Sequence, residues 1–154
     1  MTECDGRWRL AERLRLRCPA VLTELRTVRQ PVQRWARRNG LPDDALVDLQ
    51  LAVGEAVANG IEHGYRHVRT GPAGPVPAGP SGDASIEVEL ELRACAGGAE
   101  VAARVSDRGR WRQAPAEPGY RGRGLALIAQ LSREMRVSAT GRGTQVMFAI
   151  PVAF

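Results

Sequence analysis

Apolar residues recur at every second position in several stretches of this 154-residue sequence. Such alternation is typical of strands that bury one face and expose the other. Two of these stretches flank a Gly-Gly pair and two flank the residues TGRG, which predicts two antiparallel hairpins. The predicted strands are 13–18, 86–93, 101–105, 135–139 and 144–150.

A spacing of three to four residues between apolar positions predicts helices over 20–38, 42–63 and 125–133. Within the first helix we expect a kink or a one-turn break at Pro31, because proline removes a backbone donor. We expect the second helix to stop at Gly64, which is a plausible C-terminal break.

The order is strand, helix, helix, two strands, helix, two strands. This grouping predicts an α+β fold in which helices cover one face of a mixed, largely antiparallel sheet, and it argues against a doubly wound Rossmann fold. Residues 68–85 are dominated by proline and glycine, so we expect a flexible loop or disordered insertion there. The remaining chain is too short on either side for two good cores, and residues 1–154 are therefore expected to form a single domain.

Composition is ordinary for a globular protein, with 44% hydrophobic and 25% charged residues. No apolar run approaches the roughly 20 residues that span a bilayer, and the polar N-terminus lacks the apolar core of a signal peptide. We therefore expect a cytoplasmic protein with no membrane partner. Cys4, Cys18 and Cys95 are scattered, which argues against a disulfide framework or a zinc site.

The net charge of +5 and the pI of about 10.0 raise nucleic-acid binding as a rival function. Every basic residue apart from the histidines is arginine, and the arginines are spread along the chain rather than gathered in one stripe. The positive charge is therefore better explained by a coding bias toward arginine than by a surface that binds nucleic acid.

Glu55, Asn59 and His63 follow one another at steps of four, which places them on nearly one face of the second predicted helix. A carboxamide oxygen suits Mg²⁺, which prefers oxygen ligands, and a carboxylate one turn away can polarise a hydroxyl. The alternative is a solvated polar face. However, the flanking residues in GEAVANGIEHG are small and apolar, which indicates a closely packed helix whose polar residues need a partner.

Three further short motifs are weak individually. Asp107 follows a predicted strand and precedes Gly109, which fits either a site for a flat ring with an exocyclic amine or a plain Asp-x-Gly turn. Gly122 and Gly124 stand before a predicted helix, where backbone N–H groups can bind an anion or simply allow a flexible approach. Thr144 follows a turn glycine, which is common at the start of a strand.

In this order, GEAVANGIEHGY, DRGRW, GRGLALI and GT resemble the motifs of the histidine-kinase-like (GHKL) ATPases. The EAVANGIEHGY segment looks most like the anti-sigma factor serine/threonine kinases of bacteria. The resemblance covers nearly the whole chain and implies the Bergerat fold, a two-layer α/β sandwich that binds ATP with Mg²⁺. DRGRW lacks a third glycine that many members of the superfamily have.

The resemblance also implies roles for residues of an ATP site. Asn59 would coordinate Mg²⁺ at the triphosphate, and Asp107 would bind the adenine amino group. Gly109 would leave room for the ring, and Thr144 would support the contact with Asp107.

By the same resemblance, Glu55 would be the general base that receives the proton of an incoming serine hydroxyl. Gly122 and Gly124 would belong to a lid over the phosphates, beside Arg121 and Arg123, which either stabilise the transferred charge or reflect the arginine bias. His63 would be structural or would lie near the nucleotide.

The implied activity is transfer of the γ-phosphoryl group of ATP to a serine of a STAS-domain anti-anti-sigma factor. An alternative sigma factor would be the second partner, a homodimer is expected, and no direct contact with nucleic acid is implied. The alternative is an anti-sigma factor without kinase turnover, a protein-binding module whose affinity the nucleotide tunes. Autophosphorylation on histidine is not expected, because the sequence lacks the histidine-bearing dimerisation helices of a sensor kinase.

Overall fold

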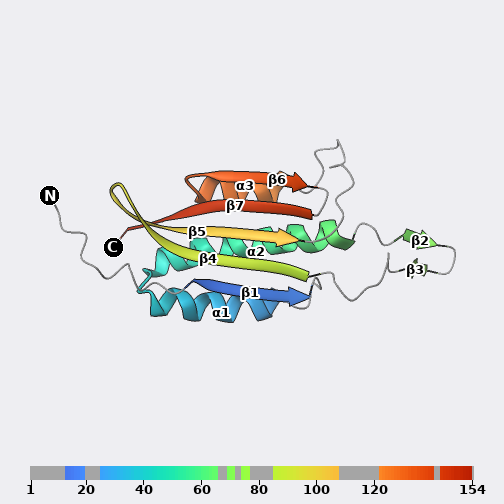
Figure 1. Ribbon diagram of the computed structural model, residues 1–154, viewed down its shortest axis with the longest axis horizontal. Helices are drawn as coiled ribbons and strands as arrows, with labels where there is room; N and C mark the ends of the chain where they lie inside the picture. The colour runs from blue at the N-terminus through green and yellow to red at the C-terminus, as the bar shows by residue number, and fades with distance from the viewer. Residues whose placement is uncertain are drawn as a thin grey trace.

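The computed structural model of the chain describes residues 13–19, 25–65, 69–71, 74–76, 85–107, 122–140 and 143–153. Five strands form one sheet in the order β1-β4-β5-β7-β6, and three helices cover one of its faces (Figure 1). The strands are β1 (Leu14–Pro19), β4 (Ser85–Cys95), β5 (Gly98–Asp107), β6 (Met135–Thr140) and β7 (Gly143–Val152). The helices are α1 (Leu25–Arg38), α2 (Asp43–Tyr65) and α3 (Gly122–Leu131).

This arrangement confirms the predicted α+β class and the two-layer architecture. The sheet is not mixed, however, because every pair of neighbouring strands in it is antiparallel. The two predicted hairpins, β4–β5 and β6–β7, supply two of these pairings, and β1 and β7 add to the exposed edges of the first hairpin in the same sense.

Strict alternation in the sequence produces the two faces of β4. Its apolar residues point toward the helices and are at most 6% exposed, while the charged residues between them lie on the opposite face. The buried set is Ile86, Val88, Leu90 and Leu92. Burying such a side chain stabilises the fold by about 1.5–3 kcal/mol, so β4 fixes which face of the sheet receives the helices.

Helix α2 lies across the middle of the sheet with α1 on one side and α3 on the other (Figure 1). Its predicted apolar stripe is buried: Leu46, Leu49, Val53, Val57 and Gly60 all face the core. Acidic Asp43 and Asp44 occupy its first turn, where carboxylates complement the positive end of the helix dipole. The helix that carries Glu55 and Asn59 is therefore held from three sides.

The predicted one-turn break at Pro31 is wrong, because α1 continues through that residue. The alternative prediction, a kink at Pro31, stays a prediction. Helix α2 ends at Tyr65, two residues beyond the predicted end near His63, and therefore includes Gly64. A glycine inside a helix costs only about 1 kcal/mol relative to alanine, which the remaining hydrogen bonds and the packing of a 23-residue helix outweigh. Residues 20–24 of the first predicted helix lie outside the described residues.

The Gly/Pro-rich segment also differs from its prediction as an unstructured loop. Arg69–Gly71 forms β2 and Gly74–Val76 forms β3, and the two pair as an antiparallel hairpin apart from the main sheet (Figure 1). Thr70 opposes Pro75 across this pair. Proline is compatible with a strand that has no further neighbour, because its missing N–H then breaks no ladder.

The apolar pattern predicted that the third helix would begin at Leu125. In the structure, α3 begins at Gly122. The first turn of a helix needs no side-chain periodicity, so glycines there do not prevent it from forming. Among the described residues, none of the helices combines the length and the apolar character that crossing a membrane requires.

Candidate functional site

The first turn of α3 rests on the face of α2 that carries Glu55 and Asn59. A β-carbon built on Gly124 would lie 2.8 Å from Glu55 Oε2, and 3.3 and 3.4 Å from Asn59 Nδ2 and Oδ1. Glycine therefore permits a contact that any side chain would obstruct. The spacing of four in the sequence places the acid and the amide together, and Gly124 lies directly against both.

Asp107 and Thr144 form a second buried contact at the neighbouring strand ends. The backbone N–H of Thr144 donates a hydrogen bond of 3.3 Å to Asp107 Oδ1, and the two residues are 8% and 7% exposed. The register explains their meeting, since β5 ends where β7 begins and Ser106 lies opposite Gln145. The sequence separated these two candidates by 37 residues.

Gly60 brings the contact of Gly124 with Glu55 and Asn59 close to the contact of Asp107 with Thr144. A β-carbon at this position would lie 3.0 Å from Ile86 Cδ1 and 3.8 Å from Asp107 Cβ. The absence of a side chain allows α2 to approach β4 and β5 closely at the position next to Asn59. The sequence reasoning used Gly60 only as part of the apolar stripe, although a glycine inside a strong helical pattern was a signal of close packing.

A small cavity of about 30 Å³ lies between these elements. Asn59, Asp107 and Thr144 border it together with apolar residues of all the surrounding elements. The apolar set is Ala56, Gly60, Val105, Leu125, Val137 and Val146. Leu125 and Val137 were not predicted as site residues, because only the three-dimensional packing brings α3 and β6 to this point.

Two polar atoms at this cavity are buried and lack a hydrogen-bond partner among the described residues: Asn59 Nδ2 and Thr144 Oγ1. Unpartnered buried polar groups cost about 1–3 kcal/mol each, and such groups in native proteins call for an explanation. A polar ring edge bound beside Asp107 would provide a partner for the Thr144 hydroxyl. Phosphate oxygens would accept from Asn59 Nδ2 and leave Oδ1 of the same amide for a cation. The residues present therefore fit a nucleotide with Mg²⁺.

The cavity in this arrangement has room for a water molecule but is far too small for a nucleotide. A nucleotide therefore requires the first turn of α3 to move outward from Glu55 and Asn59. Glycines at 122 and 124 give that turn the conformational freedom to do so.

Several predicted site residues cannot be placed. Gly109 and Arg121 lie outside the described residues, as do the side chains of His63 and Arg123. Gly122 is the first residue of α3. The proposed roles of these residues stay predictions.

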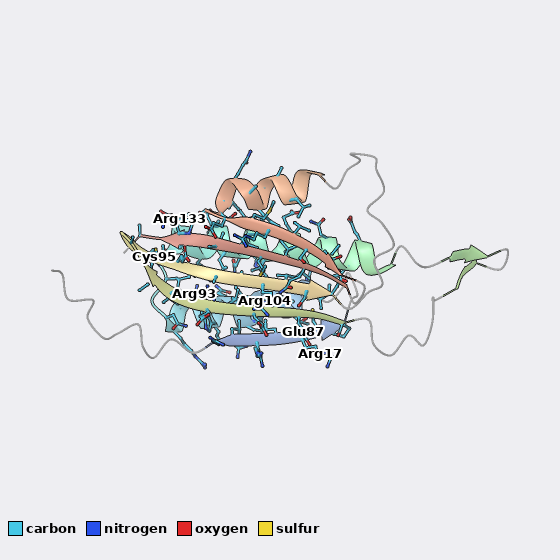
Figure 2. The ribbon with its side chains drawn as sticks, turned by 45° about the horizontal axis from the view of Figure 1, so that its top comes forward. Arg17, Glu87, Arg93, Cys95, Arg104 and Arg133 are labelled. Carbon is cyan, nitrogen blue, oxygen red and sulfur yellow. The ribbon has the colours of Figure 1, made fainter. Side chains whose placement is uncertain are left out.

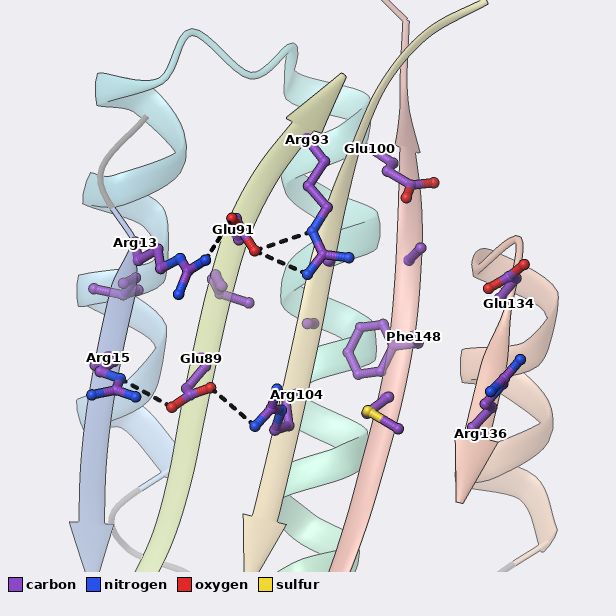
Figure 3. Close-up of a pocket in the computed structure, with 16 residues that line it drawn as sticks. Arg13, Arg15, Glu89, Glu91, Arg93, Glu100, Arg104, Glu134, Arg136 and Phe148 are labelled. Atoms are coloured by element: carbon purple, nitrogen blue, oxygen red, sulfur yellow. Dashed lines mark hydrogen bonds and ion pairs between the residues drawn. The ribbon is translucent and has the colours of Figure 1, made fainter. Parts of the chain in front are cut away.

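A larger hollow of about 400 Å³ lies on the uncovered face of the sheet, remote from Glu55 and Asn59 (Figure 3). Two carboxylates of β4 each form two ion pairs there. Glu91 joins Arg13 and Arg93, each at 3.0 Å, and Glu89 joins Arg15 at 3.0 Å and Arg104 at 3.6 Å. Because these charges are mutually paired, the hollow is a poor site for a polyanionic ligand.

The hydrogen bonds from Arg93 lower the pKa of Glu91 below its ordinary value of 4.5, partial burial opposes this shift, and Arg13 adds to the lowering. Arg93 and Arg104 stand on the same uncovered face (Figure 2). Four of the basic residues here, Arg13, Arg15, Arg93 and Arg104, are therefore paired with carboxylates rather than forming the free stripe that nucleic-acid binding would need.

The described cysteines do not form a metal site or a disulfide. Cys18 is buried in β1, and Cys95 accepts a hydrogen bond of 3.4 Å from Arg133 Nη1 (Figure 2). In the described part of the chain, no three His, Cys, Asp or Glu side chains gather closely enough to hold a metal ion. A divalent cation at Asn59 would therefore depend on oxygens of a bound phosphate, as is usual for Mg²⁺.

Comparisons with known proteins identify the family and agree with the fold. The sequence model of the histidine kinase-like ATPase domain matches residues 18–150. The crystal structure of the RsbU and RsbW domains of Rv1364c from Mycobacterium tuberculosis aligns with 92% of this chain, with a TM-score of 0.66 and 26% sequence identity. The match covers 32% of that chain, so this protein spans about a third of its length.

A second solved structure is the histidine kinase domain of a blue-light activated histidine kinase from Erythrobacter litoralis. It aligns with 84% of this chain and 60% of its own, with a TM-score of 0.46 and 20% identity.

Proposed function

Because this chain belongs to the histidine kinase-like ATPase family, we propose that it is an ATP-dependent serine/threonine protein kinase and an anti-sigma regulatory factor. It phosphorylates a serine of a STAS-domain anti-anti-sigma protein and sequesters an alternative sigma factor in the cytoplasm. The observation that carries the proposal is the convergence of Glu55 and Asn59 beneath the first turn of α3, beside Gly124. The likeness to a structure that contains an RsbW domain supports an anti-sigma kinase rather than another member of the family.

The nucleotide is held between α2, α3 and the ends of β5 and β7. Asp107 accepts a hydrogen bond from the adenine amino group, while its Oδ1 stays fixed by the backbone N–H of Thr144. The hydroxyl of Thr144, which has no partner among the described residues, completes the recognition of the ring. Val137 and Leu125 provide the apolar walls that a flat base requires.

Asn59 holds Mg²⁺ through Oδ1, the atom type that this cation prefers. When bound, Mg²⁺·ATP supplies the phosphoryl group and neutralises part of its charge. The first turn of α3 adds backbone N–H groups at the positive end of a helix dipole, which favour negative charge. Asn59 and α3 together therefore bind and orient the phosphates.

Glu55 lies one turn from Asn59 and accepts the proton of the incoming serine hydroxyl. Positioned proton transfer of this kind contributes typically about 10²–10⁴-fold to a rate. The carboxylate is half-buried, so it is open to an acceptor on one side while Gly124 limits it on the other. The chain forms a homodimer in this proposal, and partner exchange follows phosphorylation and the bound nucleotide.

The test is incubation of the protein with radiolabelled ATP and each STAS-domain protein encoded in the same genome, followed by mapping of the modified residue. We expect a single phosphoserine on one of them, formed only with Mg²⁺ present. Nucleotide-dependent binding of a STAS protein without any phosphoserine would instead establish a binding module without kinase turnover. Steep, salt-dependent binding to DNA with no affinity for STAS proteins would contradict the proposal altogether.

A further inference from the structure

Gly60 of α2 lies against the sheet where Ile86 of β4 and Asp107 of β5 stand opposite each other. A β-carbon at position 60 would lie 3.0 Å from Ile86 Cδ1 and 3.8 Å from Asp107 Cβ. Helix α2 passes over both strands at the middle of the sheet (Figure 1). The helix therefore contacts the cross-strand pair that includes Asp107, the proposed partner of adenine, through a residue without a side chain.

The needs of the helix do not explain a glycine at this position. Glycine is among the least favourable residues of a helix interior, because it loses the most backbone freedom when it becomes helical. Gly54 of the same helix has open space around it, since a β-carbon there would meet nothing within 4 Å. Of these two glycines, Gly60 alone is required by a close contact with another element.

A side chain added at position 60 would displace the helix rather than the sheet. Ile86 is fully buried, and its branched side chain has little freedom at χ1. Its strand is hydrogen-bonded on both sides, to β1 and to β5, whereas a helix rests on a sheet through side-chain packing. Overpacking of such a core shifts the backbone. The shift needed here is a few tenths of an ångström, because 3.0 Å is only slightly shorter than an ordinary contact of a β-carbon.

The position of α2 on the sheet matters for the nucleotide because of the residue next to Gly60. Asn59 precedes it and borders the small cavity together with Asp107. Asp107 belongs to the sheet and Asn59 to the helix, so the contact of α2 with β4 determines how far apart the two side chains lie. These side chains are the proposed adenine end and the proposed phosphate end of the site.

We propose that Gly60 is a positioning residue that sets the separation of these two ends, by allowing α2 to lie directly against Ile86. A nucleotide that binds both ends needs the correct separation, whereas a ligand that occupies one end does not. This inference rests on the proposed nucleotide site and is independent of phosphoryl transfer to a protein. It gives a role in ATP affinity to a residue that acts through Asn59 and Asp107.

The experiment measures the affinity of the full chain for ATP with Mg²⁺ by calorimetry, and for adenosine by ligand-observed NMR. A misplacement of 1 Å costs about 10²-fold in an active site, so the smaller shift in Gly60→Ala should weaken binding of ATP about fivefold. The affinity for adenosine should not change, because adenosine occupies the Asp107 end alone. Gly54→Ala is the matched control for helix propensity and should change neither affinity.

A second substitution tests the physical cause. Ile86→Val removes Cδ1, the atom nearest to the added β-carbon, and leaves Cγ1 at 3.6 Å, which is an ordinary contact. The double variant Gly60→Ala/Ile86→Val should therefore regain most of the wild-type affinity for ATP. Ile86→Val alone should keep that affinity and lose some stability through the vacated space. A double-mutant cycle on the four ATP affinities measures the coupling between the two positions.

The outcomes separate this inference from the kinase proposal. Unchanged ATP affinity in Gly60→Ala, or an equal loss for ATP and for adenosine, would overturn the positioning role and leave phosphoryl transfer intact. A loss of ATP affinity that Ile86→Val does not restore would also overturn it. The expected pattern of affinities in a protein that forms no phosphoserine would support the positioning role and contradict the kinase activity. A wild-type chain that binds no ATP would overturn both.

Discussion

Gly124 of α3 and Glu55 of α2 lie so close that a β-carbon on the glycine would stand 2.8 Å from the carboxylate Oε2. No real β-carbon tolerates such a distance, so one of the two groups must move if a side chain is added at 124. The obstructing atom is the end of a flexible side chain rather than backbone, and Glu55 is therefore the group that moves. This relationship links the proposed lid, to which Gly124 belongs, to the proposed general base Glu55.

Gly124→Ala should consequently lower phosphoryl transfer far more than it lowers stability. We expect kcat to fall about tenfold or more because the carboxylate is displaced, while the free energy of unfolding changes by less than about 1 kcal/mol. Thermal unfolding and steady-state kinetics measure the two quantities. Gly54→Ala is the control for helix propensity, since a β-carbon at that position meets nothing within 4 Å. In a Glu55→Ala background, Gly124→Ala should have little further effect on the rate.

Glu55→Ala should retain ATP binding and abolish phosphorylation of the STAS partner. The expected loss is about 10²–10⁴-fold in kcat, because the hydroxyl proton then has no positioned acceptor. Quantification of phosphoserine measures the rate, and calorimetry measures the affinity for ATP. Glu62→Ala, on an exposed position of the same helix, should leave both unchanged. Unchanged phosphoserine formation by Glu55→Ala would remove the base from the mechanism.

Asn59→Ala should weaken ATP binding in the presence of Mg²⁺ and have a much smaller effect in its absence. The amide oxygen is the proposed ligand of the cation, so its removal affects only the metal-bound complex. Calorimetric titrations with ATP, one set with Mg²⁺ and one with EDTA, make the comparison. A loss of equal size in both sets would indicate direct contact with the nucleotide, and no loss in either would exclude a metal role.

The sequence predicted the strands and helices whose buried faces show a regular spacing of apolar residues, every second position in a strand and every third or fourth in a helix. The alternation in β4 and the apolar stripe of α2 each predicted an element and its buried side, because burial of several aliphatic residues outweighs local preferences. The two hairpins were also predictable from their turns. What the sequence did not reveal was that β5 pairs with β7, since this contact depends on packing of the whole chain.

The same limit applies to the candidate site. A step of four residues was enough to bring Glu55 and Asn59 together, because it is a property of one helix. The contact between Asp107 and Thr144 follows from the non-local pairing of β5 with β7, and the approach of Gly124 to Glu55 follows from how α3 packs on α2. Without the resemblance to a family, the sequence offered no reason to join these pairs into one site.

Glu91→Gln should reduce stability at neutral pH and have a smaller effect at pH 3. The folded pKa of Glu91 is lowered, chiefly by hydrogen bonds from Arg93, so its ion pairs stabilise the fold above the ordinary pKa of 4.5. This contribution is lost as the pH falls through the folded pKa, because the carboxyl then binds a proton in both states. The side chain is partly exposed, so the effect should stay below about 1 kcal/mol. Denaturant unfolding at the two pH values measures it, and an equal difference at both would contradict the assignment.

Thr144→Val should stabilise the nucleotide-free protein and weaken ATP binding at the same time. Valine has nearly the same shape as threonine, and the replaced hydroxyl is buried without a partner among the described residues, so its removal should raise the free energy of unfolding by about 1 kcal/mol. If that hydroxyl serves the bound nucleotide, the affinity for ATP should fall about tenfold, and ATP should raise the melting temperature by less than in the wild type. Thr144→Ser is the matched control: it keeps the hydroxyl and should retain the affinity while losing stability through the missing methyl group. An increase in stability with unchanged ATP affinity would show that the hydroxyl has no part in binding. Asp107 alone would then have to be the polar partner of the adenine ring.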